Sequence, residues 1–398
     1  MAAALDGVRV LELLPTRHGA YATRMLADMG ARVTVVEPPA SSALAQARFE
    51  HELDRITYHS RKESVVLDIE REEALGALGA LERLAAEADV VVRSVGEELA
   101  ERLGIDEERL RAVNGPLVYA VCSGFGPRGP LAEAPGADLA AQAAGGYMAR
   151  SGFEGDPPLP AGAAIASSTG AMYLCSGILA GLVRAGRSGV GGRVDVSLYG
   201  AQIGIQSWEL DSQSVRGVVS PRIGRGHPDI SDYTLCHVFE AKDGWITLAG
   251  MGSPRWEALC DLLGLAELKG QFMPYGDRSK WVVTMGDVLE ILGEHFLLRT
   301  RAEWLEAFER VGVTAGSAQT HAEILGEAQA RTNGYVTEMA HPTLGAITVV
   351  GSPYVFGGEP TTTPPAPPPP GADTERRLQE VGVSADEIAA LRAKGVLG

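Results

Sequence analysis

The sequence has few cysteines and no cysteine pattern. The four stand far apart, with no Cys-x-x-Cys pair and no histidine at metal-ligand spacing: Cys122, Cys175, Cys236 and Cys260. A disulfide framework, a thiol redox motif and a zinc site therefore have no support. We expect reduced cysteines in the core of a cytoplasmic protein that uses no metal.

The sequence also lacks segments that would direct it into or across a membrane. Residues 1–6 carry no basic region, and no apolar run approaches the ~18 residues of a membrane span. The least polar stretch, 161–183, is interrupted by Ser, Thr and Gly, and we interpret it as a buried helix. We therefore expect neither export nor a membrane as a partner.

Positive charge is scarce. The 398 residues include 35 lysines and arginines against 51 aspartates and glutamates, which gives a formal net charge of −16. This balance argues against nucleic acid or an anionic membrane as a partner. An anionic ligand would need a local group of cations that acts against the overall field.

The N-terminal region has the pattern of a βαβ unit. A β-branched apolar run at 8–14 is followed by helical periodicity at 19–29 and a second apolar run at 33–36. Such a unit implies parallel strands. The connection at 14–19 lacks the Gly-x-Gly-x-x-Gly turn, so a dinucleotide site is not expected.

The chain is too long for one ordinary core, and we predict two domains. The fold class is α/β, with an open, mainly parallel sheet in a large domain and a smaller inserted α+β domain. The small domain begins with a predicted β-hairpin at 234–249, in which an Asp-Gly turn joins two strands. A Pro-rich tether occupies 361–370. The predicted parts are the N-terminal part of the large domain (1–200), a linker (201–231), the small domain (232–325), and a return linker with the C-terminal part of the large domain (326–398).

One stretch, Pro135–Gly146, could carry chemistry. A Gly/Pro turn there presents Asp138 at the start of a helix of small residues. Helix N–H groups and the helix dipole keep such a carboxylate ionised, as a nucleophile requires. Asp is also a preferred N-cap, so the spacing alone leaves both interpretations open.

Segments along nearly the whole chain resemble the family III CoA-transferases, a group that also contains 2-methylacyl-CoA racemases. The matching segments are Leu5–Glu12, Tyr21–Ala31, Ser64–Asp68, Ser123–Gly126, Pro135–Asp138, Arg193–Leu198 and Gly395–Leu397. The resemblance implies an acyl-CoA and a carboxylic acid as substrates, with coenzyme A carried as the thioester. It also implies an interlocked homodimer and Asp138 as a covalent nucleophile.

The resemblance implies further substrate contacts. Arg17 stands where these transferases often carry Gln, and His18 follows it; a surface ion pair and a structural histidine are the alternatives. The mobile glycine loop of the family corresponds to a short glycine-containing segment of this sequence, which could equally be an ordinary turn. That segment comprises Gly224, Arg225, Gly226 and His227.

The expected CoA contacts depart from the family pattern. Pro38-Pro39 and Glu70 stand where basic residues are usual, and Arg93-Ser94-Val95-Gly96-Glu97 replaces an Asn-Phe-x-Pro-Gly motif. The candidate CoA-binding residues are Leu67, Arg71, Ser94 and Arg102, with Arg61 as a further possible phosphate contact. A non-catalytic or repurposed acyl-CoA-binding protein is therefore an alternative.

A racemase is a weaker alternative. The racemase branch of the resembling family places a His directly before the Asp and a second Asp about 28 residues later. Here these positions are Ala137 and Ala166, and neither side chain can transfer a proton.

Overall fold

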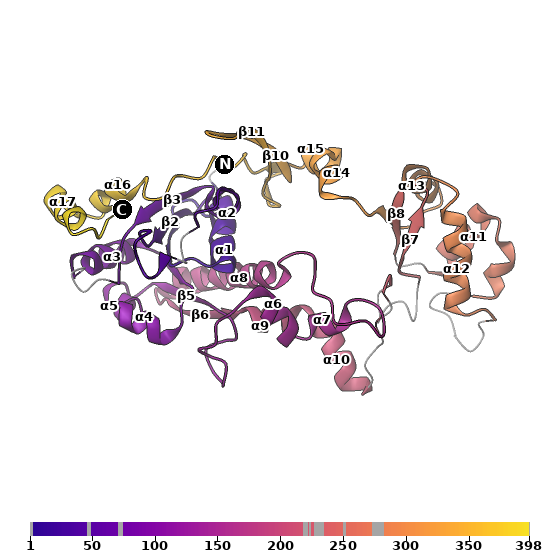
Figure 1. The fold of residues 1–398 in the computed structure, drawn as a ribbon, viewed down its shortest axis with the longest axis horizontal. Helices are drawn as coiled ribbons and strands as arrows, with labels where there is room; N and C mark the ends of the chain where they lie inside the picture. The colour runs from indigo at the N-terminus through magenta and orange to yellow at the C-terminus, as the bar shows by residue number, and fades with distance from the viewer. Residues whose placement is uncertain are drawn as a thin grey trace. The chain divides into compact units, whose positions relative to one another are not determined.

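The structure is a computed structural model, and its described residues form two compact groups. The sheet unit consists of residues 1–146, 161–206 and 327–398, and the small unit of 147–160 and 207–326 (Figure 1). The sequence-based domain boundaries at 200, 231 and 325 remain predictions. The described residues are 3–45, 49–70, 75–217, 222, 224–226, 235–249, 252–272 and 282–397.

The sheet unit is built on six strands that all pair in parallel, which confirms the predicted open parallel sheet. In spatial order they are β3 (Lys62–Val66), β2 (Arg32–Glu37), β1 (Arg9–Leu13), β4 (Val90–Arg93), β5 (Val118–Ser123) and β6 (Gly192–Ser197). The chain order reverses between β1 and β4. Open α/β sheets bind ligands at the carboxyl ends of the strands beside such a reversal.

Both faces of the sheet are covered. Alternate strand residues such as Val10 and Val92 face one core, and Leu11 and Val91 face the other. Strands buried on both faces are apolar throughout, which is why the sequence shows continuous apolar runs. The first face carries α1 (Arg17–Asp28) and α8 (Ile165–Ser188), and the second α3 (Leu75–Glu87), α4 (Glu97–Leu103), α5 (Glu107–Val113), α16 (Thr374–Glu380) and α17 (Ala385–Ala393).

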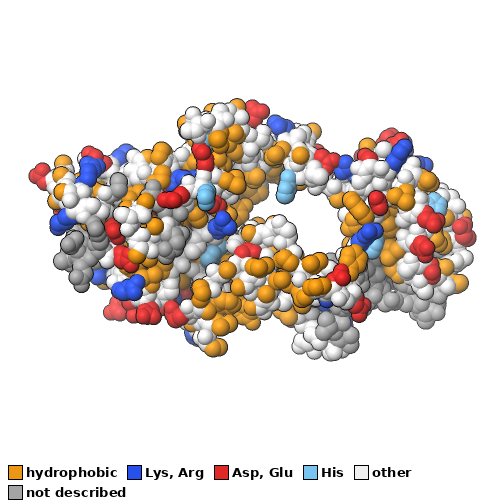
Figure 2. All heavy atoms as spheres, viewed as in Figure 1, with side chains coloured by type: hydrophobic (Ala, Val, Ile, Leu, Met, Phe, Trp, Pro, Cys, Tyr) orange, Lys and Arg blue, Asp and Glu red, His pale blue; other side chains and the backbone are white. Residues whose placement is uncertain are grey.

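Helix α8 has two different sides. By length and composition it could cross a membrane, but Gly177 and Gly181 pack it closely on the sheet. A β-carbon at these glycines would lie 2.7 and 2.8 Å from side-chain atoms of Val194 and Val118. The other side leaves apolar side chains such as Val183 exposed, and Figure 2 shows apolar atoms gathered over α8 and α9 (Leu198–Ile205).

The C-terminal segment closes the free edge of β3. The backbone N–H of Ser64 donates to the Asp373 carboxylate at 2.9 Å, and that of Val66 donates to the Thr374 hydroxyl at 3.0 Å. Just beyond the strand, Leu67 forms an antiparallel bridge with Leu397. An exposed strand edge is a template for unwanted pairing, and here the chain's own end occupies it.

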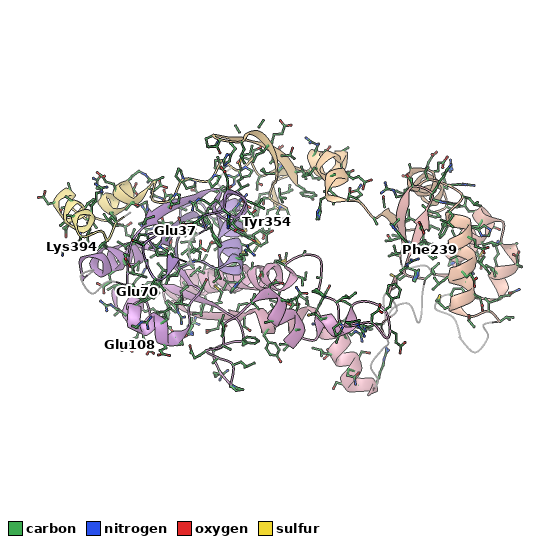
Figure 3. The ribbon with its side chains drawn as sticks, viewed as in Figure 1. Glu37, Glu70, Glu108, Phe239, Tyr354 and Lys394 are labelled. Carbon is green, nitrogen blue, oxygen red and sulfur yellow. The ribbon has the colours of Figure 1, made fainter. Side chains whose placement is uncertain are left out.

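A buried polar network lies beneath this closure. Glu37, at the end of β2 (Figure 3), accepts hydrogen bonds from the Arg55 guanidinium at 3.0 Å and the Ser64 hydroxyl at 2.7 Å. Arg55 also donates to the backbone oxygen of Pro368 at 2.6 Å. The Pro-rich segment is thereby attached to the sheet, and it has no helix or strand between 361 and 370.

The remaining elements of the sheet unit include one that the sequence analysis missed. Within the predicted return linker, β10 and β11 form an antiparallel hairpin. These elements are α2 (Glu52–His59), α6 (Asp138–Ala144), α15 (Ala328–Thr332), β10 (Val336–His341), β11 (Gly345–Val350), β12 (Val355–Phe356) and β13 (Glu359–Pro360).

The small unit contains the predicted hairpin. Strands β7 (His237–Ala241) and β8 (Gly244–Leu248) pair antiparallel, and β9 (Ala315–Ser317) joins β8. Phe239 (Figure 3) packs edge-on against Phe296 in an aromatic core. The helices are α7 (Tyr147–Arg150), α10 (Ser207–Arg216), α11 (Ser253–Leu263), α12 (Met285–Phe296), α13 (Arg301–Arg310) and α14 (His321–Gly326), with a 3₁₀ helix at Ala266–Gly270.

Candidate active site

The turn that leads to Asp138 is closed by two glycines. A β-carbon on Gly124 would lie 2.4 Å from the α-carbon of Gly136, so the two backbones touch where side chains would keep them apart. Gly124 directly follows β5, and Gly136 comes two residues before α6. The loop between them therefore returns to the carboxyl end of the sheet before α6 begins.

Asp138 does not cap its own helix. Residue Ala137 takes the N-cap position of α6, without a side-chain bond, and Asp138 is the first helical residue. Its Oδ1 accepts a hydrogen bond from the backbone N–H of Ser167 at 2.7 Å. Ser167 is the third residue of α8, so the carboxylate lies at the N-terminus of a 24-residue helix. Free N–H groups and the helix dipole there favour the ionised carboxylate.

Gln142 holds the other carboxylate oxygen. It lies one turn after Asp138 on α6, is 2% exposed, and donates from Nε2 to Oδ2 of Asp138 at 2.6 Å. Its own Oε1 accepts from the Ala161 backbone N–H at 2.9 Å, which fixes the direction of the amide. The sequence analysis missed Gln142 and Ser167; a glutamine four residues after an aspartate on one helix was the available signal.

His18 lies close to the same carboxylate. It is the second residue of α1, follows β1 at the reversal point of the sheet, and is buried beside Gly170 of α8. Burial lowers the pKa of His18 to about 4, against the opposing influence of the Cys122 backbone and the Asp138 charge. The ring is therefore neutral near pH 7. Thr16 Oγ1 lies 3.1 Å from Nδ1, and Nε2 has no hydrogen-bond partner within the described part of the chain.

Arg17 lies in an aromatic and charged setting. Its guanidinium is more than half exposed and lies 3.4 Å from the carboxylate of Asp54, so the ion pair considered in the sequence analysis is present. Tyr58, one turn after Asp54 on α2, packs against Tyr21 and Phe49. Burial raises the pKa of Tyr58, which is also influenced by the charges of Arg17 and Asp138.

The candidate CoA-binding residues in the sheet unit are partly engaged elsewhere. The Leu67 side chain is fully buried, and the Ser94 hydroxyl lies 2.9 Å from the Cys122 thiol. The side chain of Leu67 is therefore closed to a ligand, and its backbone N–H already donates to the Glu37 carbonyl at 3.0 Å. Arg102 is exposed in the last turn of α4. Arg71 lies outside the described residues.

Two other arginines near the altered CoA motifs have internal partners. Arg93 is fully buried, where it donates to the Tyr119 hydroxyl at 2.6 Å and also contacts Glu97. Arg61 forms an ion pair with Asp28 at 3.1 Å. Neither guanidinium is free to replace a lost phosphate contact.

The described part of the glycine loop belongs to the small unit. Gly224 has a φ of +64°, and a β-carbon there would lie 2.2 Å from the Phe153 ring, so only glycine fits. The Arg225 guanidinium lies 4.5 Å from the centre of the Trp245 ring, and Gly226 forms a bridge with His237. His227 lies outside the described residues. The structure therefore groups Arg17, His18 and Asp138 in one unit and Gly224–Gly226 in the other.

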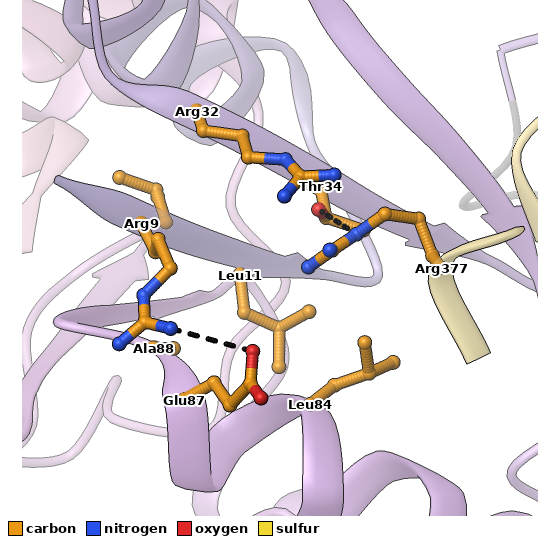
Figure 4. Close-up of a pocket in the computed structure, with 9 residues that line it drawn as sticks. Arg9, Leu11, Arg32, Thr34, Leu84, Glu87, Ala88 and Arg377 are labelled. Carbon is orange, nitrogen blue, oxygen red and sulfur yellow. Dashed lines mark hydrogen bonds and ion pairs between the residues drawn. The ribbon is translucent and has the colours of Figure 1, made fainter. Parts of the chain in front are cut away.

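A small pocket lies at the opposite, amino-terminal edge of the sheet (Figure 4). Its three arginines are paired: Arg9 with Glu87 at 3.3 Å, and Arg32 and Arg377 with Glu63 at 3.0 and 3.1 Å. These cations are neutralised by protein carboxylates, so the pocket has little attraction for an anionic ligand. No group of three or more potential metal ligands is found among the described residues.

Comparison with known proteins identifies relatives along most of the chain. The model of CoA-transferase family III matches residues 5–374. Succinate–glutarate CoA-transferase of Agrobacterium fabrum is 29% identical, over 89% of this chain and 90% of that protein. Acetyl-CoA:oxalate CoA-transferase of Acetobacter aceti is 30% identical, over 78% and 79%.

A solved structure shares the fold. A CAIB/BAIF family protein from Brucella suis superposes with a TM-score of 0.79 at 25% identity, covering 96% of this chain and all of the other. The resemblance stated from the sequence motifs is therefore confirmed at family level. The protein is an enzyme that belongs to CoA-transferase family III.

Proposed function

We propose that this enzyme moves CoA from an acyl-CoA thioester to a carboxylic acid, with Asp138 as the covalent nucleophile. The observation that carries the proposal is the setting of Asp138. Both carboxylate oxygens accept hydrogen bonds, from Ser167 N–H at 2.7 Å and Gln142 Nε2 at 2.6 Å. The positive end of the α8 dipole lies at this carboxylate, which is a suitable setting for a carboxylate nucleophile. Three curated relatives are named as CoA-transferases, acting on succinate and glutarate, on acetyl-CoA and oxalate, and on formyl-CoA and oxalate, and these names support this reaction class.

The reaction proceeds through two kinds of covalent species. An Asp138 oxygen attacks the thioester carbonyl carbon, the carbon–sulfur bond breaks, and CoA thiolate leaves a mixed anhydride. The thiolate attacks Cγ of Asp138, the bond from Cγ to the acyl oxygen breaks, and the donor acid departs. The acceptor carboxylate and the thiolate then repeat both exchanges in reverse order, which frees Asp138. Each exchange is easier than direct transfer between the two acids.

His18 and Arg17 have complementary roles in this proposal. In the tautomer in which Nδ1 accepts from the Thr16 hydroxyl, the ring proton of His18 lies on Nε2 and can donate to the substrate carbonyl oxygen. Arg17 supplies positive charge for the acceptor carboxylate. We retain Gly224, Arg225, Gly226 and His227 as substrate-binding residues in this proposal, on the strength of the family resemblance of their sequence.

We assign CoA binding to the backbone carbonyl of Leu67 and to the polar side chains of Ser94, Arg71 and Arg102. The internal pairing of Arg61 and Arg93 favours weaker phosphate binding than in a protein with free cations. This pairing supports the second candidate function, an acyl-CoA-binding protein without transferase activity. Calorimetry with CoA and several acyl-CoAs tests it: micromolar binding together with turnover excludes this candidate.

The decisive test uses Asp138→Ala and Asp138→Asn. Both variants should fold and lose transfer activity, because neither side chain is an ionised nucleophile. Peptide mass spectrometry of the wild-type enzyme after incubation with acyl-CoA should locate a CoA or acyl adduct on Asp138. Full activity in the alanine variant, or an adduct on a different residue, would contradict the assignment of Asp138 as the nucleophile.

We further propose a cytoplasmic homodimer. Its support is the apolar side of the α6–α8–α9 region, which the other described residues of the sheet unit leave exposed, together with the Pro-rich tether at 361–370. In a symmetric homodimer, the same surface of a second chain would cover these apolar side chains and remove them from water. The exposed apolar residues are Leu139, Met172, Tyr173, Val183, Ile203 and Ile205.

A further inference from the structure

We propose that the N-terminus of α8 and the Gln142 amide give the two oxygens of Asp138 different roles. The Ser167 N–H stabilises the oxyanion that forms at the enzyme's own carboxyl carbon, Cγ of Asp138, and Gln142 holds the oxygen that makes and breaks bonds. The inference rests on the proposed function and extends it. It gives Gln142 and the Ser167 N–H catalytic roles in the steps in which bonds to Cγ of Asp138 form and break. The substrate's carbonyl carbon is a separate centre that needs donors of its own.

The chemistry requires charge stabilisation at Cγ twice per turnover. When CoA thiolate attacks Cγ of the mixed anhydride, the remaining C=O of Asp138 becomes an oxyanion until the bond to the donor acid breaks. When the acceptor carboxylate attacks the aspartyl thioester, the same oxygen again becomes an oxyanion until the carbon–sulfur bond breaks. The other Asp138 oxygen bridges to the acyl group and leaves with the donor acid. One oxygen thus carries the charge, and the other makes and breaks bonds.

The two hydrogen bonds assign these roles. Oδ1 faces the Ser167 N–H at 2.7 Å, within the ~2.7–3.1 Å expected of an oxyanion donor. That N–H belongs to the first turn of α8, so it has no acceptor within its own helix. A backbone donor at the positive end of a long helix needs no rearrangement as charge develops. We therefore assign Oδ1 as the oxygen that carries the charge.

Gln142 serves the bond-making oxygen. Its amide is oriented by the Ala161 N–H, which donates to Oε1 at 2.9 Å and leaves Nε2 directed at Oδ2 at 2.6 Å. Reversing the amide would place two donors against each other at Ala161 and two acceptors against each other at Asp138. Toward Asp138, the Gln142 amide can therefore act only as a donor. It holds Oδ2 toward the substrate during attack, and it stabilises the charge on the same oxygen when the anhydride breaks.

The neighbouring buried glutamines lack this connection and provide a matched control. Gln206, on the chain just after α9, donates to the backbone oxygens of Gly145 and Gln202 at 2.9 and 2.7 Å. It is nearly as buried as Gln142 and lies in the same helical region. Substituting Gln206 removes a buried amide without touching Asp138.

The test compares Gln142→Met, Gln142→Glu and Gln206→Met by rapid quench and peptide mass spectrometry. With acyl-CoA and no acceptor, Gln142→Met should form the aspartyl-CoA adduct about 10²- to 10³-fold more slowly, with little change in KM. Gln206→Met should react at the wild-type rate. Adduct formation at the wild-type rate in Gln142→Met overturns the inference. Absence of any adduct on wild-type Asp138 instead overturns the proposed function.

Gln142→Glu gives a second readout, independent of how well the Met variant folds. Two carboxyl groups this close cannot both ionise easily, so the pair binds a proton to a higher pH than an isolated carboxyl. Below that pH the introduced carboxyl donates to Oδ2, and above it the two charges repel. Activity should therefore fall with rising pH in this variant but not in the wild-type enzyme. Parallel pH profiles contradict a donor role for Gln142.

Discussion

The α-carbon of Gly136 lies 2.4 Å from where Gly124 would carry a β-carbon, and the reverse distance is 2.3 Å. This contact joins the end of β5 to the residues before α6, and it sets where Asp138 leaves the loop. Neither glycine has a positive φ, so the requirement comes from close approach and not from backbone conformation. The position of the nucleophile therefore depends on two residues that cannot themselves react.

Gly136→Ala should separate the two backbones and displace Asp138. Overpacking of this kind costs about 1–3 kcal/mol of folding stability, and activity should fall further than stability because Asp138 must stay aligned with Ser167. Gly115→Ala is the matched control, since no atom lies within 4 Å of its added β-carbon. Thermal unfolding and initial rates measure both effects. Wild-type activity in Gly136→Ala contradicts this account of the turn.

The free energy of unfolding should fall as pH falls from about 6.5, in part because of His18. Its pKa is about 4 in the folded protein, against 6.5 ordinarily. The unfolded chain therefore binds more protons between these values, which favours unfolding as the solution becomes acidic. One pKa unit corresponds to about 1.4 kcal/mol, so His18 alone should cost about 2 kcal/mol by pH 5.

Urea unfolding at pH 7 and pH 5 checks the His18 prediction. His59 is also buried, with its pKa held well below the usual value, so part of the pH dependence will persist in any His18 variant. His18→Asn should reduce the difference between the two pH values, and an unchanged difference would contradict protonation of His18 as a cause. The quantity to compare is the change with pH, because the substitution can also alter stability at pH 7.

Lys62→Met should destabilise the sheet unit more than an ordinary core substitution. The Lys62 ammonium is fully buried and donates to Glu12 at 2.7 Å, to Thr23 and to the Ala20 carbonyl. Removing it leaves the buried Glu12 carboxylate without its charged partner, although the Thr23 hydroxyl still donates to it at 2.7 Å, and the cost is about 3–5 kcal/mol. Adding Glu12→Gln should recover much of that loss. A urea double-mutant cycle that shows simple additivity would refute the coupling.

Val183→Asp tests the proposed homodimer. Val183 is about half exposed on the outer side of α8, so a carboxylate there would be desolvated at an interface and harmless on a monomer. Light scattering should show a lower mass for the variant at low concentration. Val113→Asp, at the end of α5 on the other face of the sheet, is the control. A folded, active wild-type monomer at nanomolar concentration would refute interlocking.

The sequence predicts the sheet well and part of the site less well. Strands buried on both faces and amphipathic helices have strong local patterns, so β1, α1 and β2 were predicted close to their observed bounds. The β10–β11 hairpin was missed because several of its residues are exposed and its alternation is weak. Arg93 belonged to an altered motif at a strand end, and only tertiary packing reveals that it is buried with Tyr119.

Local sequence patterns predict the position of Asp138 on its helix but not all of its hydrogen-bond partners. Its place at the start of a helix was visible in the sequence, but the donor from Ser167 comes from another helix, 29 residues away. Which helix N-terminus reaches the carboxylate depends on how α6 and α8 pack. The Gln142 contact is different, because its four-residue spacing is local and could have been recognised.

The edge of β3 is covered by residues that are synthesised much later than the strand itself, so this edge stays open while the rest of the chain is translated. Val66 leaves the ribosome 308 residues before Thr374, the residue that occupies its N–H. At roughly 5–20 residues per second, the strand edge waits about 15–60 seconds for its partner. During that interval the nascent sheet is an unfinished template that can bind a neighbouring chain. Molecular chaperones should therefore matter most before Asp373 and Thr374 emerge, and a ribosome stalled before these residues would hold a sheet with an open side.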